Sequence, residues 1–135
     1  MYKQLSVFAE NKRGAMNSMT KLLKEAQINI TALVTNDSAE FGIVRMIVDD
    51  PQKAYDIMSK AGYLCKLDSV IAIDIGDEVG SLDKLLEFIT SSYINVDYLY
   101  LSFNRKTSTP IVILHAPDSD ELENFLQSKG YATVK

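Results

Sequence analysis

The stretch GAMNSMTKLLKEAQINI, residues 14–30, decides how this chain folds, because a related stretch occurs once more. The second copy is GSLDKLLEFITSSYINV, residues 80–96, which begins 66 positions later (14 to 80). Each copy begins with glycine and ends on an asparagine between two aliphatic residues, with apolar residues at helical spacing in between. Two copies of one unit indicate a tandem duplication.

The repeat extends beyond these two stretches. Pro51 recurs as Pro117 with the same offset, whereas Gly62 recurs as Gly130 with an offset of 68. A two-residue insertion at Asp118-Ser119 explains the longer offset. Halves of about 65 residues are near the lower size limit for independent folding, so each half should be stabilised by the other. The repeat therefore predicts two related domains, residues 1–68 and residues 69–135.

The composition and charge exclude several classes of protein. The chain has 135 residues, of which 47% are hydrophobic and 24% charged, as in globular proteins. A net charge of -4 argues against a nucleic-acid partner, which calls for a basic face. The single cysteine, Cys65, cannot form an internal disulfide, and the start of the chain does not resemble a signal peptide. No apolar run approaches the roughly 20 residues that span a bilayer. We therefore expect a cytoplasmic protein without a membrane partner.

Apolar periodicity predicts the same order of elements in both halves, strand-helix-strand-strand-helix-strand. In the first half, Leu5, Val7 and Ala9 alternate as in a strand, and Asp50-Pro51 and Gly62 mark the two ends of a helix. The first half should have strands at 3–10, 28–36, 41–48 and 63–67, helices at 15–26 and between Pro51 and Gly62, and a polar turn at 37–40. The second half should have strands at 70–75, 94–104, 110–116 and 131–135, and helices at 81–92 and 119–129.

This order is the ferredoxin-like plan of the α+β class, an antiparallel sheet with both helices on one face. On the face opposite the helices, the third strand carries Arg45 in the first half but Ile111 and Ile113 in the second. That apolar surface has no assigned cover in the second half. It therefore predicts a contact between the two units or between two chains, and it favours a homodimer.

Two features of each repeat have both a structural and a functional interpretation. Gly14 and Gly80 either only permit the turn before the helix or also let a ligand approach the free N–H groups of the helix start. Asn29 and Asn95 either cap a turn or offer their amides to a small ligand. The duplication leaves both alternatives open, because a structural residue is duplicated as faithfully as a functional one.

Both halves resemble ACT domains, small ligand-binding modules in which a strand leads through an Asn/Asp-x-Pro-Gly-x-Leu turn to a helix and then to a strand that opens with Asn-Ile. The first half has Asn11-x-x-Gly14-x-Met16 followed by Asn29-Ile30, and the second has Asp77-x-x-Gly80-x-Leu82 followed by Asn95-Val96. The resemblance covers essentially the whole chain. The proline of the motif is replaced by Arg13 in one copy and by Val79 in the other. We expect no catalytic domain beside the two modules.

The resemblance implies regulation. ACT domains pair side by side into an eight-stranded sheet and bind amino acids at the seam, between the glycine turn of one module and the asparagine-bearing strand of its neighbour. It implies a free L-amino acid as effector, a homodimer, and an enzyme or transporter as the regulated partner. Carried over to this chain, it nominates these ligand-binding residues: Asn11, Arg13, Gly14, Ala15, Met16, Asn29, Ile30, Asp77, Val79, Gly80, Ser81, Leu82, Asn95 and Val96.

The two turns differ in charge. Lys12 and Arg13 make the first turn basic, and Asp77 and Glu78 make the second acidic. We therefore expect the first site to favour a carboxylate-rich ligand and the second to favour an ammonium group or a cationic side chain.

Catalysis finds little support in the sequence. His115 ends a strand and Cys65 lies in the other copy, with no third residue to orient such a pair. These two residues are also too few for a transition-metal site. We expect no enzyme activity, metal or cofactor. The leading hypothesis is an amino-acid-binding regulatory protein, and the alternative is a dimerisation or interaction scaffold that binds no ligand.

Overall fold

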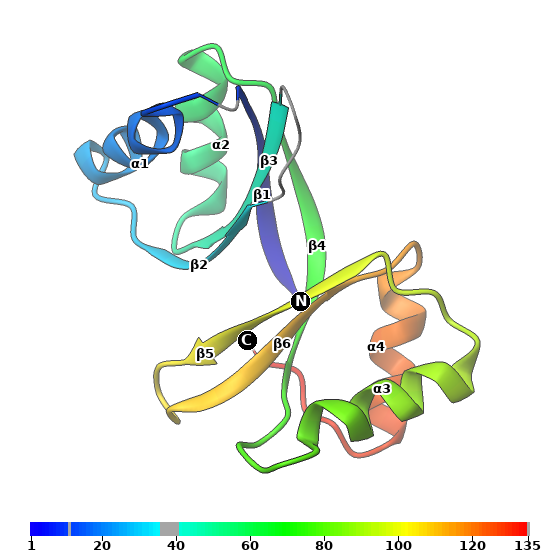
Figure 1. Cartoon of the computed structure of the whole chain (residues 1–135). Coiled ribbons are helices and arrows are strands. Elements are labelled where there is room, and N and C mark those ends of the chain that lie inside the picture. Colours follow the sequence, from blue (N-terminus) through cyan, green and yellow to red (C-terminus); the bar gives the residue numbers. More distant parts are fainter. Residues whose placement is uncertain (11, 36–40, 135) are drawn as a thin grey trace. The chain divides into compact units, whose positions relative to one another are not determined.

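The computed structural model describes residues 1–10, 12–35 and 41–134 (Figure 1). The chain divides into two compact units. The first unit is Lys3–Asp68, and the second unit is Ser69–Lys135 together with Met1–Tyr2. The predicted turn at 37–40 lies outside the described residues.

The first unit has the predicted ferredoxin-like order of elements. Its strands pair antiparallel in the order β2-β3-β1-β4. Figure 1 shows α1 and α2 on the same side of these strands. The elements are β1 (Tyr2–Glu10), α1 (Ala15–Glu25), β2 (Ile30–Thr35), β3 (Phe41–Val48), α2 (Pro51–Lys60) and the first part of β4 (Cys65–Asp74).

The second unit repeats this order but closes differently. The later part of β4 pairs with β6, and β6 pairs with β5, again antiparallel. The predicted strand at 131–135 is wrong in extent, since the described part of that segment forms a single bridge, Thr133 to Ile73. The remaining elements are α3 (Ser81–Ser92), β5 (Tyr98–Asn104), β6 (Thr109–His115) and α4 (Ser119–Ser128).

The described residues form six strands, so the eight-stranded sheet expected from the resemblance is not what this chain shows. Two predicted strands, 63–67 and 70–75, are one strand, β4. The segment Cys65–Asp74 contains neither glycine nor proline, so nothing interrupts an extended backbone between the halves. The last predicted strand contributes only its bridge.

Each unit has its own hydrophobic core between helices and sheet, and the two cores are built from repeat-related positions. Leu5 and Val7 of β1 correspond to Ile71 and Ile73 of β4, and all four side chains are fully buried. In the first core they are joined by Met19, Leu23, Met46, Ala54 and Met58. In the second core they are joined by Leu85, Ile89, Val112, Leu114, Leu122 and Leu126.

The apolar face predicted to lack a cover is not an open surface. Ile111 and Ile113 are 3% and 0% exposed, so they give no reason to expect a second chain there. Exposed apolar side chains lie instead on β5, where Leu101 is 55% and Phe103 is 59% exposed. Tertiary packing decides how a sheet's second face is covered, so the sequence alone could not show that these two side chains are buried.

The second helix of each unit begins with an aspartate cap. A carboxylate oxygen of Asp50 accepts a hydrogen bond from the Lys53 N–H at 3.2 Å, and Asp118 accepts one from the Glu121 N–H at 3.0 Å. We expect Asp50→Ala and Asp118→Ala each to lower the free energy of unfolding by about 1 kcal/mol, because a backbone donor of the helix loses its partner. Urea titrations followed by circular dichroism measure this.

Asp120→Ala is the matched control for these caps, since Asp120 is an acidic residue in the first turn of α4 that does not cap it. Its loss weakens only a favourable interaction with the helix dipole, worth a few tenths of a kcal/mol at an exposed site. Equal losses at Asp118 and Asp120 would contradict the capping role.

Candidate functional site

The two glycine turns have the same backbone geometry. Gly14 and Gly80 stand at the helix N-caps with φ of 84° and 89°, in the left-handed region that costs other L-residues about 1–2 kcal/mol. Neither helix start receives a hydrogen bond from a side chain of its N-cap residue, since that residue is glycine.

The first turn leaves two backbone donors open. The Ala15 N–H donates to the Lys12 carbonyl at 3.2 Å, and the Ser18 N–H donates to the Gly14 carbonyl at 3.0 Å. Between them, the N–H groups of Met16 and Asn17 have no hydrogen-bond partner among the described residues. Such donors at a helix start attract a carboxylate or phosphate.

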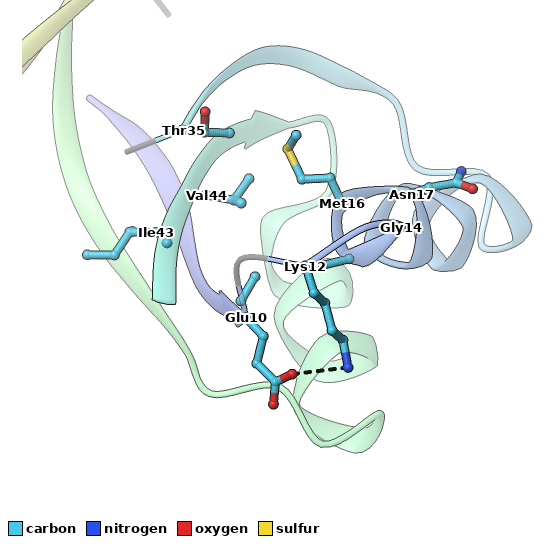
Figure 2. Close-up of a pocket in the computed structure, with 11 residues that line it drawn as sticks. Glu10, Lys12, Gly14, Met16, Asn17, Thr35, Ile43 and Val44 are labelled. Atoms are coloured by element: carbon cyan, nitrogen blue, oxygen red, sulfur yellow. Dashed lines mark ion pairs between the residues drawn. The ribbon is translucent and has the colours of Figure 1, made fainter. Parts of the chain in front are cut away.

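A pocket of about 480 Å³ lies at this first turn and is called the glycine pocket below. It is lined by the turn and the first residues of α1, by the last residues of β1, and by the adjoining ends of β2 and β3. Figure 2 shows Met16 and Val44 pointing toward each other beside Thr35, with Glu10 and Lys12 at the opposite side. Its volume is in the range of small-molecule sites.

An ion pair stands at the edge of the glycine pocket. Lys12 Nζ lies 3.0 Å from Glu10 Oε2, and both side chains are well exposed (Figure 2). The first turn is therefore less basic than its sequence suggests, because a carboxylate from the end of β1 offsets one of the two expected cations. An exposed pair of this kind contributes at most about 1 kcal/mol to stability, so both groups stay available to a ligand.

The predicted residues of the first repeat divide into two groups. Gly14, Ala15 and Met16 line the glycine pocket, whereas Arg13 is exposed and is not part of its lining. Asn11 lies outside the described residues.

Asn29 and Ile30 lie at the other end of α1. The backbone of Asn29 makes two hydrogen bonds with Asp49, each 3.1 Å long. The Asn29 N–H donates to a carboxylate oxygen of Asp49, and the Asn29 carbonyl accepts from the Asp49 N–H. Ile30 packs against the first core. Because 11 residues of helix span about 16 Å, Asn29 and the glycine turn of one unit cannot hold the same small ligand. A shared site requires turn and asparagine from different modules.

The second repeat places its predicted residues similarly. Asp77, Val79, Gly80 and Asn95 are exposed, and Val79 is fully open to solvent. Ser81 is half-buried, and its hydroxyl oxygen accepts a hydrogen bond from the Glu78 N–H at 3.3 Å. Leu82 and Val96 pack against the second core and thus have a structural role.

Several pocket residues were not predicted from the sequence. Thr35 and Val44 face each other across β2 and β3, and Gly42 pairs with Ala9 of β1. These residues reach the turn through strand register, which apolar periodicity does not reveal. The sequence shows that the acidic Glu10 lies next to the turn, but its ion pair with Lys12 depends on how the two side chains are placed.

His115 is half-buried and contacts two neighbouring side chains. Its Nδ1 lies 2.8 Å from a carboxylate oxygen of Asp97, and its ring stacks on Tyr98 with 5.0 Å between centroids and 3° between planes. Cys65 is half-buried, with its sulfur 3.2 Å from the Ser59 hydroxyl oxygen. The described part of the chain contains no group of three potential metal ligands. It also contains no helix long and apolar enough to span a bilayer.

Comparison with known proteins agrees with the fold. A family model described as an ACT domain pair matches residues 1–129. The crystal structure of protein BT0572 from Bacteroides thetaiotaomicron is 31% identical, with a TM-score of 0.90, over 98% of this chain and 91% of that one. No curated protein gives a significant match.

More distant structures share the fold. The regulatory subunit of aspartate kinase from Thermus thermophilus, in its ligand-free form, has a TM-score of 0.69 at 14% identity, over 94% of this chain and 91% of that one. A putative C-terminal regulatory domain of aspartate kinase from Porphyromonas gingivalis W83 has a TM-score of 0.56 at 16% identity, over 95% and 92% of the two chains.

Proposed function

We propose, on the premise that this chain belongs to the ACT domain pair family, that it is a regulatory protein whose effector is a free amino acid bound at the glycine pocket. The observation that carries the proposal is the pocket itself, in which unpartnered helix N–H groups and an accessible ion pair border one hollow. The fold is shared with regulatory subunits of aspartate kinase, which supports a role in controlling an enzyme.

The pocket supplies complementary groups for a zwitterion. The open N–H groups of Met16 and Asn17, at the positive end of the α1 dipole, suit an α-carboxylate. The Glu10 carboxylate suits an α-ammonium group, and Lys12 offers a second cation. The Met16 and Val44 side chains leave an apolar wall for the ligand's side chain.

Regulation would follow from a shift in populations. A ligand that also contacts an asparagine-bearing strand of a second module stabilises the arrangement in which both parts are in place. That arrangement presents a particular surface to the regulated enzyme, and partner binding in turn strengthens ligand binding. We place this function in the cytoplasm and the second module in the partner chain of a homodimer.

A thermal-shift screen with each of the twenty amino acids tests the proposal. At 100 times its dissociation constant, a true effector adds about 2.7 kcal/mol to the free energy of unfolding, because it binds the folded state alone. Titration calorimetry with the best amino acid then gives the stoichiometry. If none of the twenty raises the midpoint or releases heat, the amino-acid effector is ruled out.

One observation favours a scaffold as second candidate. Among the described residues, β5 stands at one end of the strand order, next to β6, and carries the exposed Leu101 and Phe103. An apolar edge strand is a surface on which another chain can add a strand. If this were the function, sedimentation would show a dimer that Phe103→Glu dissociates, and no amino acid would change the unfolding midpoint.

A further inference from the structure

Each unit has a hollow between the start of its first helix and the glycine and tyrosine that follow its second helix. In the first unit it has a volume of about 500 Å³, and Ser18, Gly62 and Tyr63 are among its lining residues. In the second unit it has about 340 Å³ and is called the lysine pocket below. The residues of the lysine pocket that matter here are Glu78, Ser81, Lys84, Phe88, Lys129 and Tyr131.

The two hollows are equivalent by the repeat but differ in chemistry. Gly62 and Tyr63 correspond to Gly130 and Tyr131, so the same wall closes both hollows. The residue equivalent to Ser18 in the second unit is Lys84, and the residue equivalent to Ala61 is Lys129. The duplicated fold therefore explains the hollow, but it does not explain the two lysines.

Lys129 is held in place by aromatic rings. Its Nζ lies 5.8 Å from the centroid of Phe88 and 5.5 Å from that of Phe125, within the range of cation–π attraction. Phe88 in turn contacts Tyr131 edge to face, with 6.0 Å between centroids. The ammonium group is thus presented at an aromatic wall, where its charge also suits the C-terminal end of α4.

Lys84 lacks any such structural explanation. It is the fourth residue of α3, near the positive end of the helix dipole, where a cation is unfavourable. Its ammonium group has no carboxylate partner among the described residues. With Glu78 as the single acidic residue of the lining, the lysine pocket keeps an excess of positive charge.

We propose that the lysine pocket binds a small organic anion, a carboxylate with a flat apolar body. The carboxylate is held by Lys84 and Lys129, and the body lies against the rings of Phe88 and Tyr131. The Tyr131 phenol is protonated at neutral pH, as tyrosine ordinarily is, and so serves as a hydrogen-bond donor; burial raises its pKa further. This site does not depend on the glycine pocket or on its effector.

Benzoate is a suitable probe, and the two units of the intact chain provide an internal control. In ¹H–¹⁵N correlation spectra at constant ionic strength, benzoate should shift the amides of Ser81, Lys84 and Gly130 saturably. We expect a dissociation constant on the order of millimolar. The amides of Ser18 and Gly62 lie in the hollow whose one lysine, Lys12, is paired with Glu10, and they should not follow this curve.

Substitutions separate specific binding from a general effect of charge. Lys84→Gln and Lys129→Gln should each raise the dissociation constant of benzoate about five- to tenfold, since each removes one charge-assisted contact. Lys106→Gln changes the net charge equally at an exposed loop position and should have no effect. Neutral benzamide should bind far more weakly than benzoate. The proposal is overturned if both hollows respond alike, if benzamide matches benzoate, or if Lys84→Gln leaves the titration unchanged.

Discussion

Leu85→Ala is expected to lower the free energy of unfolding by about 2–5 kcal/mol. Leu85 lies on α3 and is completely buried in the second core. Truncation removes apolar surface from the core and leaves a cavity that the surrounding side chains fill only in part. A loss of this size is a large fraction of the stability of a small protein. Urea unfolding monitored by far-ultraviolet circular dichroism measures it.

The neighbouring residue provides the control for this substitution. Leu86 has the same side chain on the same helix but is 36% exposed and belongs to neither core. Leu86→Ala should cost well under 1 kcal/mol, because exposed substitutions remove little packing and alanine is a good helix former. Similar losses for Leu85→Ala and Leu86→Ala would show that the second core is not packed as described.

Gly14→Val is expected both to destabilise the protein and to abolish the response to its amino acid. No atom lies within 4 Å of the position that a Cβ would occupy, so the cost is conformational. A left-handed backbone costs an L-residue about 1–2 kcal/mol, and a β-branched residue adopts it least readily. If the turn relaxes, the N–H groups of Met16 and Asn17 leave the positions in which they face the ligand. Thermal unfolding with and without the effector measures both effects.

The second repeat supplies the matched variant. Gly80 has nearly the same φ and the same open surroundings, so Gly80→Val should cost the same stability. It should leave binding at the glycine pocket intact. The amino acid at 100 times its dissociation constant should therefore still raise the free energy of unfolding by about 2.7 kcal/mol. Gly14→Asn should be tolerated better than valine, since asparagine visits the left-handed region. Equal loss of ligand response in both valine variants would place the effector elsewhere.

Much of the fold was predictable because the information is local. Helical spacing in residues 14–30 and 80–96 gave the positions of α1 and α3, and glycine marked their starts. Asp50-Pro51 marked the start of α2 for the same reason. Two predicted strands form the single strand β4, which the sequence analysis missed. The break was predicted at Asp68-Ser69 because these residues are polar, but the segment contains no glycine or proline that would end a strand.

Less of the candidate site was predictable. The resemblance pointed to Gly14, Ala15 and Met16, which line the glycine pocket. It could not supply Thr35 and Val44, which arrive through the register of β2 against β3. The pairing of Lys12 with Glu10 changed the expected charge of the turn, since the charge felt by a ligand depends on which side chains meet in space.

By itself, the sequence determined the duplication, the order of helices and strands, and the left-handed turns at Gly14 and Gly80, because each follows from neighbouring residues and their conformational preferences. The tertiary structure alone decided that Ile111 and Ile113 are buried, that β2 and β3 complete the glycine pocket, and that Lys84 and Lys129 border one hollow. These features join residues far apart in the chain, and their distances depend on packing rather than on spacing along the sequence.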